Sequence, residues 1–480
     1  MRTDEIVYLR SGRGRWLLAA TIIGSGVSFL DSTVVNVALP SIAKDLDADV
    51  AGGQWTITGY GLTLAALILI GGALGDRYGR RRIFVVGTAW FGAASILCAA
   101  APNIELLIAA RLLQGVGAAL LTPGSLSIIS SSFAKEDRAK AIGIWSGLSG
   151  VTTLLGPFLG GWLVDTASWR WIFIINVPLC LAVAVISARH VPDSRDPDAT
   201  GRPDITGAVL GSIGLGGITY ALIAAGDTGL DVRVMASSVV GVLGLVAFVL
   251  AEHREKHPML PPEIFKSRQF TAANLATFLV YAALSGNAFL LTIELRVGVG
   301  YSALAAGASL TPITILMLTL SPSSGSVATR LGPRLPMTVG PLICAAGNAW
   351  LAVNVGPGSA YIADVLPGVV LLGLGLAITV TPLTATVLGA APERHAGVAS
   401  GVNNAVARGA GLLAVAVLPL AAGLHGDALT NPDAFTAGYR IGVWICAALL
   451  AAGGVVAFAT IRNRLVIADA ADTTDAAAAG

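Results

Sequence analysis

The sequence predicts an all-α integral membrane protein that crosses the bilayer fourteen times. Composition, the length of the apolar stretches and the placement of positive charge all indicate this fold class. Of 480 residues, 55% are hydrophobic and 12% are charged, whereas an ordinary soluble domain has roughly 25% charged residues. A soluble chain of this length would need a polar surface over two or three domains, which so few charges cannot provide. Most of the surface is therefore expected to face lipid.

The first apolar stretch follows three arginines, Arg10, Arg13 and Arg15, as the core of a secretory signal also does. It continues from Trp16 to Leu39. At 1.5 Å per residue this length crosses a hydrocarbon core of about 30 Å. The segment is therefore predicted to be a retained first helix.

Thirteen further stretches of spanning length follow the first, and they fall into groups of six, two and six. The fourteen predicted spans lie near residues 16–39, 54–75, 82–101, 104–129, 140–163, 171–189, 205–225, 233–251, 270–295, 302–327, 335–355, 360–388, 397–422 and 438–460.

Polar, proline-bearing segments at residues 190–204 and 252–269 separate these groups. They predict four parts: an N-terminal six-helix bundle (1–190), a linker with two additional transmembrane helices (191–268), a C-terminal six-helix bundle (269–464) and a disordered cytoplasmic tail (465–480).

The distribution of Lys and Arg predicts which side of the membrane each loop faces. If the N-terminus is cytoplasmic, the inside segments hold 23 of the 30 Lys and Arg residues and the outside loops hold five. The remaining two, Arg111 and Arg408, lie deep within spans. Cytoplasmic loops are enriched in Lys and Arg, so we expect a multi-pass protein of the cell membrane with both termini in the cytoplasm.

An internal repeat supports the division into halves. Gly72, Arg77, Gly79 and Arg81, at the end of span 2 and just after it, recur 253 residues later as Gly325, Arg330, Gly332 and Arg334. Gly143, Ser146 and Gly147 recur 254 residues later as Gly397, Ser400 and Gly401. Both copies begin on the same predicted membrane side. The halves are therefore expected to be parallel repeats about an axis along the membrane normal.

The loop after span 2 reads Gly-Gly-Ala-Leu-Gly-Asp-Arg-Tyr-Gly-Arg-Arg-Arg, residues 71–82. A plain positive-inside anchor would explain its arginines but not the interleaved acid and glycines. The loop resembles the signature of the major facilitator superfamily, which implies that fold and a cytoplasmic gate latched by the acid. Asp76 can sit against the positive N-terminus of another helix. The second copy has Thr329 in place of Asp76. The implied gate residues are Gly72, Asp76, Arg77, Gly79, Arg80 and Arg81.

Two charges in the first half are predicted to couple transport to protons. Asp31 in span 1 and Arg111 in span 4 both lie in segments similar to motifs of the superfamily, and they are roughly 12 and 10 Å below the outer surface. Burial favours the protonated form of a carboxyl group, and a nearby guanidinium favours the ionised form. A movement that changes their contact would load and release a proton; a static ion pair is the alternative.

Span 5 is rich in glycine and contains a proline, which predicts close helix packing and a kink. Its Gly-Pro-x-x-Gly-Gly end resembles the motif of the exporting antiporters of the superfamily, although Thr152 stands where that motif has a glycine. The implied antiporter motif residues are Gly143, Gly147, Gly156, Pro157, Gly160 and Gly161.

The entry of span 6, residues 169–178, reads Trp-Arg-Trp-Ile-Phe-Ile-Ile-Asn-Val-Pro. An interfacial aromatic belt would explain Trp169 and Trp171 by themselves. The whole run is similar to the fourteen-helix drug:proton antiporters, and the resemblance covers nearly the whole chain. It implies export of small amphipathic molecules, including antibiotics, in exchange for protons.

Polar groups within the spans are candidates for a substrate cavity: Asn36, Gln114, Asn287, Asn403, Asn404 and Arg408. Arg408 lies roughly 16 Å into span 13, near the midplane. No acid lies near the midplane of spans 10 or 13, which permits an anionic or neutral substrate. Glu294 and Arg296, at the outer end of span 9, are expected to form an interfacial pair.

Other function classes lack sequence support. The chain has no Walker lysine loop, no His-Glu-x-x-His and no Gly-x-Ser-x-Gly, so we expect neither an enzyme nor an ATP-driven pump. The four cysteines lie in apolar runs, and His395 is expected to be a surface residue, so no metal site or cofactor is predicted beyond the proton gradient. The expected partners are a small-molecule substrate, protons and the lipid bilayer. No nucleic-acid partner is expected, and the protein is expected to be a monomer. A proton-coupled uptake symporter, or an exporter of a lipid or metabolite, is the alternative.

Overall fold

The computed structural model describes residues 6–195, 204–255, 262–390, 396–429 and 431–463. Within these residues the chain is helical, apart from short connections and one isolated β-bridge between Val7 and Phe133. His395 and the predicted tail at 465–480 lie outside the described residues.

The first half of the chain forms seven helical segments, because the predicted span 6 contains a break at Ile175. They are α1 (Gly12–Asp45), α2 (Val50–Tyr78), α3 (Arg80–Ala100), α4 (Ile104–Ser132), α5 (Lys135–Thr166), α6 (Trp171–Ile174) and α7 (Asn176–His190).

Two helices follow, and the second half adds seven more with short helical turns between them. The central pair is α8 (Ile205–Thr228) and α9 (Val232–Arg254). The second half contains η2 (Pro262–Lys266), α10 (Arg268–Val297), α11 (Ala303–Ser309), α12 (Thr311–Leu331), α13 (Arg334–Asn354), η3 (Tyr361–Val365), α14 (Leu366–Gly389), α15 (Ala396–Ala421), η5 (Gly426–Leu429) and α16 (Pro432–Thr460).

Thirteen helical segments of the described residues are long and apolar enough to cross a membrane. Together with α5, which has 32 residues and packs along α1, they account for the fourteen predicted spans. The predicted span at 302–327 is divided at Leu310 into α11 and α12. Pro312 follows the break, in the first turn of α12, where a residue without an N–H group is tolerated.

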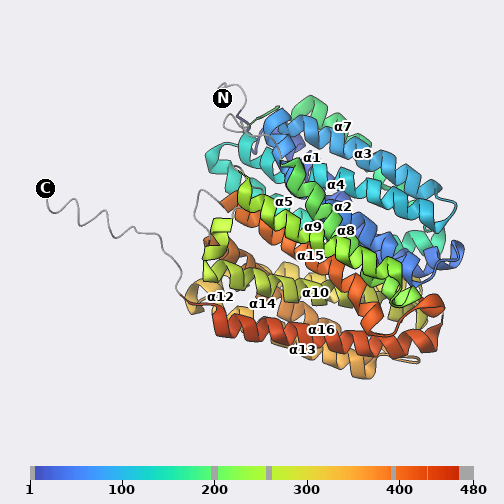
Figure 1. The fold of residues 1–480 in the computed structure, drawn as a ribbon. Helices are drawn as coiled ribbons and strands as arrows, with labels where there is room; N and C mark the ends of the chain where they lie inside the picture. Colours follow the sequence, from blue (N-terminus) through green and yellow to red (C-terminus); the bar gives the residue numbers. More distant parts are fainter. Residues whose placement is uncertain (1–5, 196–203, 256–261, 391–395, 430, 464–480) are drawn as a thin grey trace.

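The two halves lie side by side along parallel helices, with α8 and α9 across the boundary between them (Figure 1). Helix α8 packs on α2 of the first half and on α15 of the second, while α9 packs on α8. Glycines on α8 and α9 permit this contact, since a Cβ on Gly217 would lie 2.8 Å from the Cα of Gly241. In the most apolar stretch of α9 only 17% of the residues are buried, against 67% in α1, so α9 mostly faces lipid.

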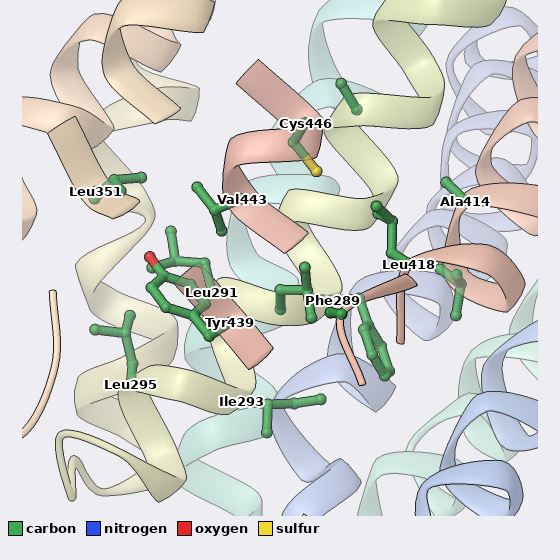
Figure 2. Close-up of a cluster of buried hydrophobic side chains, with 14 of the residues drawn as sticks. Phe289, Leu291, Ile293, Leu295, Leu351, Ala414, Leu418, Tyr439, Val443 and Cys446 are labelled. Carbon is green, nitrogen blue, oxygen red and sulfur yellow. The ribbon is translucent and has the colours of Figure 1, made fainter. Parts of the chain in front are cut away.

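The core of the second half is built around α10. Phe289, Leu291, Ile293 and Leu295 on α10 are buried against side chains of α15 and α16, including Leu418 and Tyr439 (Figure 2). These α10 residues alternate along the chain yet all are buried, because α10 is surrounded by protein rather than lipid. Helix α10 therefore occupies the inside of its bundle.

The internal repeat has a structural counterpart at the ends of α2 and α12. Gly79 and Gly332 both have a positive φ, +112° and +81°, which side chains rarely adopt. The next matching pair of residues also behaves alike: Arg81 donates to the carbonyl of Val191 after α7, and Arg334 donates to the carbonyl of Phe458 near the end of α16. The same turn thus joins the second and third spans of each half and ties them to the last span.

Candidate transport site

Asp31 on α1 and Arg111 on α4 form a hydrogen-bonded ion pair in the interior of the first half. Each side chain is 1% exposed. Both lie in the middle of long helices, so the membrane-spanning architecture itself carries these charges into the apolar interior. An uncompensated charge there is costly, and the pair neutralises itself.

Arg111 has further partners on α2. Its Nε donates to the carbonyl of Thr56 at 2.9 Å, and its guanidinium lies 4.4 Å from the centre of the Tyr60 ring. The Tyr60 hydroxyl in turn is 2.7 Å from the hydroxyl of Ser28 on α1. The arginine is therefore held between α1, α2 and α4 by a carboxylate, a carbonyl and an aromatic face.

Gln114 belongs to this network rather than to the substrate cavity predicted for it. Its carbonyl accepts from Arg111 at 2.6 Å, and its amide donates to Asp31 at 2.9 Å and to Ser95 at 2.9 Å. Arg111 and Gln114 are three residues apart on α4, which places them on the same helix face. The prediction that Gln114 lines the cavity is wrong because these bonds bury it completely.

Asn176 and Ser95 are parts of the network that the sequence analysis missed. The amide of Asn176 donates to Asp31 at 3.1 Å and to Ser95 at 3.4 Å. Asn176 falls within the segment whose tryptophans suggest an interfacial belt. The sequence could have indicated Asn176 by its position at the start of an apolar helix, because a buried amide there needs polar partners.

A cavity of about 440 Å³ lies beside this network, between α1 and α2 of the first half and α10 and α15 of the second. Arg111 and Tyr60 belong to both. The remaining lining residues are Phe29, Ser32, Val35, Asn36, Ile57, Thr58, Gly61, Leu64, Tyr281, Ser285, Ala288, Asn404, Ala407, Arg408, Gly411, Leu412 and Val415. The cavity thus has apolar walls with a few polar groups, as small-molecule sites do.

Of the candidates for a substrate cavity, Asn36, Asn404 and Arg408 line this cavity, whereas Asn287 and Asn403 are not among its described lining residues. Asn287 is buried within the second half. Asn403 accepts a hydrogen bond from Thr277 of α10 at 2.9 Å, so it joins two helices of its own bundle.

Arg408 differs from Arg111 in having no counter-charge among the described residues. The structure shows no ion pair or hydrogen bond of Arg408 with the described residues, and its buried Nε has no partner. It faces the cavity from α15.

The predicted gate segment consists of the last two turns of α2, Gly79 and the start of α3. Asp76 pairs with Arg80 at 2.8 Å, four residues later, and the described contacts do not include the helix N-terminus suggested for it. Gly72 lies near Pro123 of α4, and the guanidinium of Arg77 lies 5.5 Å from the Tyr78 ring. In this conformation Asp76 therefore joins the end of α2 to the start of α3.

The glycines of α5 divide into close and open positions. A Cβ on Gly156 would lie 2.0 Å from Oγ1 of Thr33, and one on Gly160 would lie 2.9 Å from Val34. Both contacts are with α1. Gly143 instead has open space around it, and Gly147 lies outside the residues whose packing the structure describes. Close packing against α1 is thus concentrated in the second part of α5.

The end of α5 also contacts the second half of the molecule. A Cβ on Gly161 would lie 2.4 Å from the carbonyl oxygen of Ala303, and one on Gly307 would lie 2.1 Å from that of Pro157. These residues bring α5 and α11 into backbone contact. Thr152, which stands where the motif has a glycine, packs against Gly26 of α1. A Cβ on Gly26 would lie 2.9 Å from the methyl group of Thr152.

Polar contacts join the halves at the end predicted to face outward. Asp165 of α5 accepts from the N–H groups of Ala303 and Leu304 at 3.0 and 2.8 Å, where it caps α11. Gln54 of α2 donates to the carbonyl of Val415 at 2.7 Å. These hydrogen bonds hold the two halves together at this end.

Glu294 and Arg296 do not form the expected pair. Glu294 is fully buried and accepts from Thr436 of α16 at 2.8 Å, whereas Arg296 donates to Ser41 of α1 at 2.9 Å. Residues two apart on a helix point in different directions, so they cannot face each other. Arg296 therefore adds a further link between the halves.

Comparison with known proteins identifies the family. The model of the Major Facilitator Superfamily matches residues 21–415. The chain belongs to the major facilitator superfamily. This confirms the resemblance drawn from the motifs, and it makes the protein a multi-pass membrane transporter rather than an enzyme. Members of this superfamily need no cofactor in general, and the described residues contain no cluster of metal-binding side chains.

The transporter is similar over most of its length to proteins of drug resistance and export. It is 38% identical to the methylenomycin A resistance protein of Bacillus subtilis, over 85% of this chain and 87% of that protein. It is 35% identical to the puromycin resistance protein of Streptomyces alboniger, over 95% and 92%. A multidrug export protein of Haemophilus influenzae is 33% identical, over 81% and 76%.

Solved structures share the fold at low identity. A crystal structure of a peptide transporter in complex with sulfate has a TM-score of 0.68 and 15% identity, over 95% of this chain and 96% of that one. A bacterial homologue of the human lysosomal transporter Spinster has a TM-score of 0.68 and 17% identity, over 94% and 97%. The predicted all-helical membrane fold is thereby confirmed.

Proposed function

We propose that this transporter exports small amphipathic organic molecules, such as drugs or antibiotics, in exchange for protons. One observation carries the proposal: Arg111 is bonded to the buried carboxylate of Asp31 and also lines the cavity between the halves. The same guanidinium is therefore in reach of the proton site and of a bound substrate.

Coupling follows from this shared position. When Asp31 takes up a proton, it loses the negative charge that holds Arg111, and the guanidinium is free to turn toward the cavity. When Asp31 is ionised, the ion pair forms again. Because a change of partner by Arg111 alters the cavity wall, protonation and substrate binding influence each other.

Export is supported by two independent findings. Relatives over most of the chain are named for resistance to or export of drugs and antibiotics. The glycines of α5, whose motif resembles that of the exporting antiporters, also bring it against both α1 and α11, so this helix lies at the interface between the halves. An uptake symporter would move substrate and protons in the same direction, which a transport assay distinguishes.

The remaining features of the proposal concern orientation and gating. The distribution of Lys and Arg favours cytoplasmic termini in the cell membrane, and the transporter is expected to act as a monomer. The loop containing Gly72, Asp76, Arg77, Gly79, Arg80 and Arg81 is proposed to latch the cytoplasmic end. In the present conformation, Asp76 would have to leave Arg80 before it could do so.

Proton release by substrate tests the function. In inverted membrane vesicles loaded with protons, adding a transported drug should release protons from the wild-type protein, and Asp31→Asn should abolish this release. Asparagine retains hydrogen-bonding atoms but cannot ionise. Asp433→Asn, at an exposed position near the start of α16, is the matched control and should behave as the wild type.

The size-exclusion profile must show that the Asp31→Asn protein remains folded. Substrate-driven proton release that is unchanged in this folded variant would overturn the proton role of Asp31. Accumulation of substrate in the same direction as proton movement would identify a symporter instead.

A further inference from the structure

The charges around the central cavity are unbalanced. Its described lining residues include two arginines, Arg111 and Arg408, and no aspartate or glutamate. Asp31 neutralises Arg111 from behind the cavity wall. The charge of Arg408 therefore remains as the net charge facing the cavity.

Arg408 is placed as a binding residue rather than as a structural one. A structural arginine inside a membrane protein is paired with an acid or with backbone carbonyls, as Arg111 is with Asp31 and Thr56. Arg408 has no such partner among the described residues, and its Nε is buried without a hydrogen bond. The missing partner would be supplied by a ligand in the cavity.

The rest of the lining defines what kind of ligand fits. Phe29, Ile57, Leu64, Leu412 and Val415 form apolar walls from both halves, and the volume of about 440 Å³ suits a molecule of several fused or linked rings. Hydroxyl groups of Ser32, Tyr281 and Ser285 also line the cavity. These groups suit oxygen-rich aromatic substrates.

We propose that the physiological substrates are amphipathic monoanions, such as polycyclic aromatic carboxylates or enolates, and that Arg408 is their counter-charge. This proposal rests on the proposed antiport function and specifies its substrate class. The planar guanidinium can donate two parallel hydrogen bonds to a carboxylate, which a lysine cannot.

The charge of the substrate changes how the membrane potential acts on transport. With one proton entering per substrate, export of a monoanion moves two elementary charges, export of a neutral molecule moves one and export of a monocation moves none. A potential that is negative on the cytoplasmic side should therefore accelerate export of an anion most.

Binding to purified transporter in detergent tests the substrate class with matched probes. The panel consists of 1-naphthoate and anthracene-9-carboxylate, their neutral amides and the corresponding aminomethyl cations, measured by isothermal titration calorimetry. The carboxylates should bind most tightly, and Arg408→Gln should weaken their binding by about tenfold or more while leaving the amides unaffected. Arg408→Lys should restore binding in part. Arg233→Gln, at an exposed arginine in the first turn of α9, is the matched control.

Introducing an acid beside Arg408 provides the converse test. Asn404 also lines the cavity, one helical turn before Arg408. Asn404→Asp would supply the missing acid and pair with Arg408, so it should weaken carboxylate binding by about tenfold or more. Asn354→Asp adds the same charge at the end of α13, at a residue that does not line the cavity, and should bind the carboxylates as the wild type does.

The outcomes separate this proposal from the proposed function. If the cations or amides bind as well as the carboxylates, or if Arg408→Gln binds carboxylates normally, the anion proposal is overturned. In proteoliposomes, proton-coupled export of the cations with inert carboxylates would leave antiport standing and refute the substrate class. Absence of proton movement with every compound, including the drugs of the vesicle assay, would refute antiport itself.

Discussion

The carboxylate of Asp31 accepts hydrogen bonds from three side chains. Arg111 and Gln114 come from α4, and Asn176 from the start of α7. All are almost completely buried. A buried carboxylate needs such donors, because its oxygens have no water to bond. Neutral amides therefore hold Asp31 in place together with the arginine.

Asn176→Ala tests the contribution of the amide on α7. Loss of this donor removes one of the three side chains that hold Asp31, so substrate-driven proton release should decrease. The free energy of unfolding should fall by about 1–3 kcal/mol, because Ser95 and Asp31 each lose a buried partner. Both quantities can be measured on purified and reconstituted protein.

Asn354→Ala is the control, because that amide donates only to the carbonyl of Trp350 within its own helix. A variant of Asn176 with reduced stability but unchanged substrate-driven proton release would show that the amide has only a structural role.

For single residues, the sequence predicted the depth in the membrane better than the direction in which the side chain points. Asp31 and Arg111 were identified together because charges within spans are rare and these two lie at matching depth. Asn403 and Asn404 have almost the same depth, but successive helix residues point about 100° apart, and only Asn404 reaches the cavity. The predicted pair of Glu294 and Arg296 is wrong for the same reason, because residues two apart on a helix point in different directions.

At the scale of elements, α5 is the helix whose sequence is most directly explained by its contacts. Gly156 and Gly160 let α1 approach, and Gly161 lets α11 of the other half approach. The predicted glycine motif is thus a contact surface with two sides. The partner on the second side, α11, could not be predicted, since its approach depends on the break at Leu310.

A comparison of two glycines on α5 tests this interpretation. Gly156→Ala should destabilise the protein by about 1–3 kcal/mol through overpacking against Thr33 and should reduce transport. Gly143→Ala should be tolerated, because a Cβ there meets no other group, and alanine is about 1 kcal/mol more favourable than glycine within a helix. Thermal unfolding and drug export of the two variants can be compared directly. Equal loss of stability in both would contradict the packing explanation.

At the scale of the whole molecule, hydropathy and the repeat predicted the helix count and the pseudo-equivalent halves. Apolar length and a recurring turn are properties of single segments and can be recognised without a structure. The breaks at Ile175 and Leu310 depend on packing and were missed. The division at residues 190, 268 and 464 stays a prediction.

Labelling of introduced cysteines tests the predicted topology. All four native cysteines are buried, so a membrane-impermeant maleimide should report only the introduced thiol. Leu230→Cys, between α8 and α9, should react in intact cells, because Leu230 is 87% exposed in a predicted outer loop. Lys266→Cys, exposed before α10, should react only after the membrane is permeabilised. The reverse pattern would invert the topology.

The position of α8 also limits the routes into the cavity from the side. Two seams separate the halves: one between α2 and α15, the other where α5 meets α11 and α12. Helix α8 packs over the first seam, with α9 outside it (Figure 1). A compound dissolved in the lipid on that side meets a double wall of helices before it can reach the cavity. Lateral entry from the bilayer is therefore asymmetric in this transporter, and the α5–α12 seam is the less protected of the two.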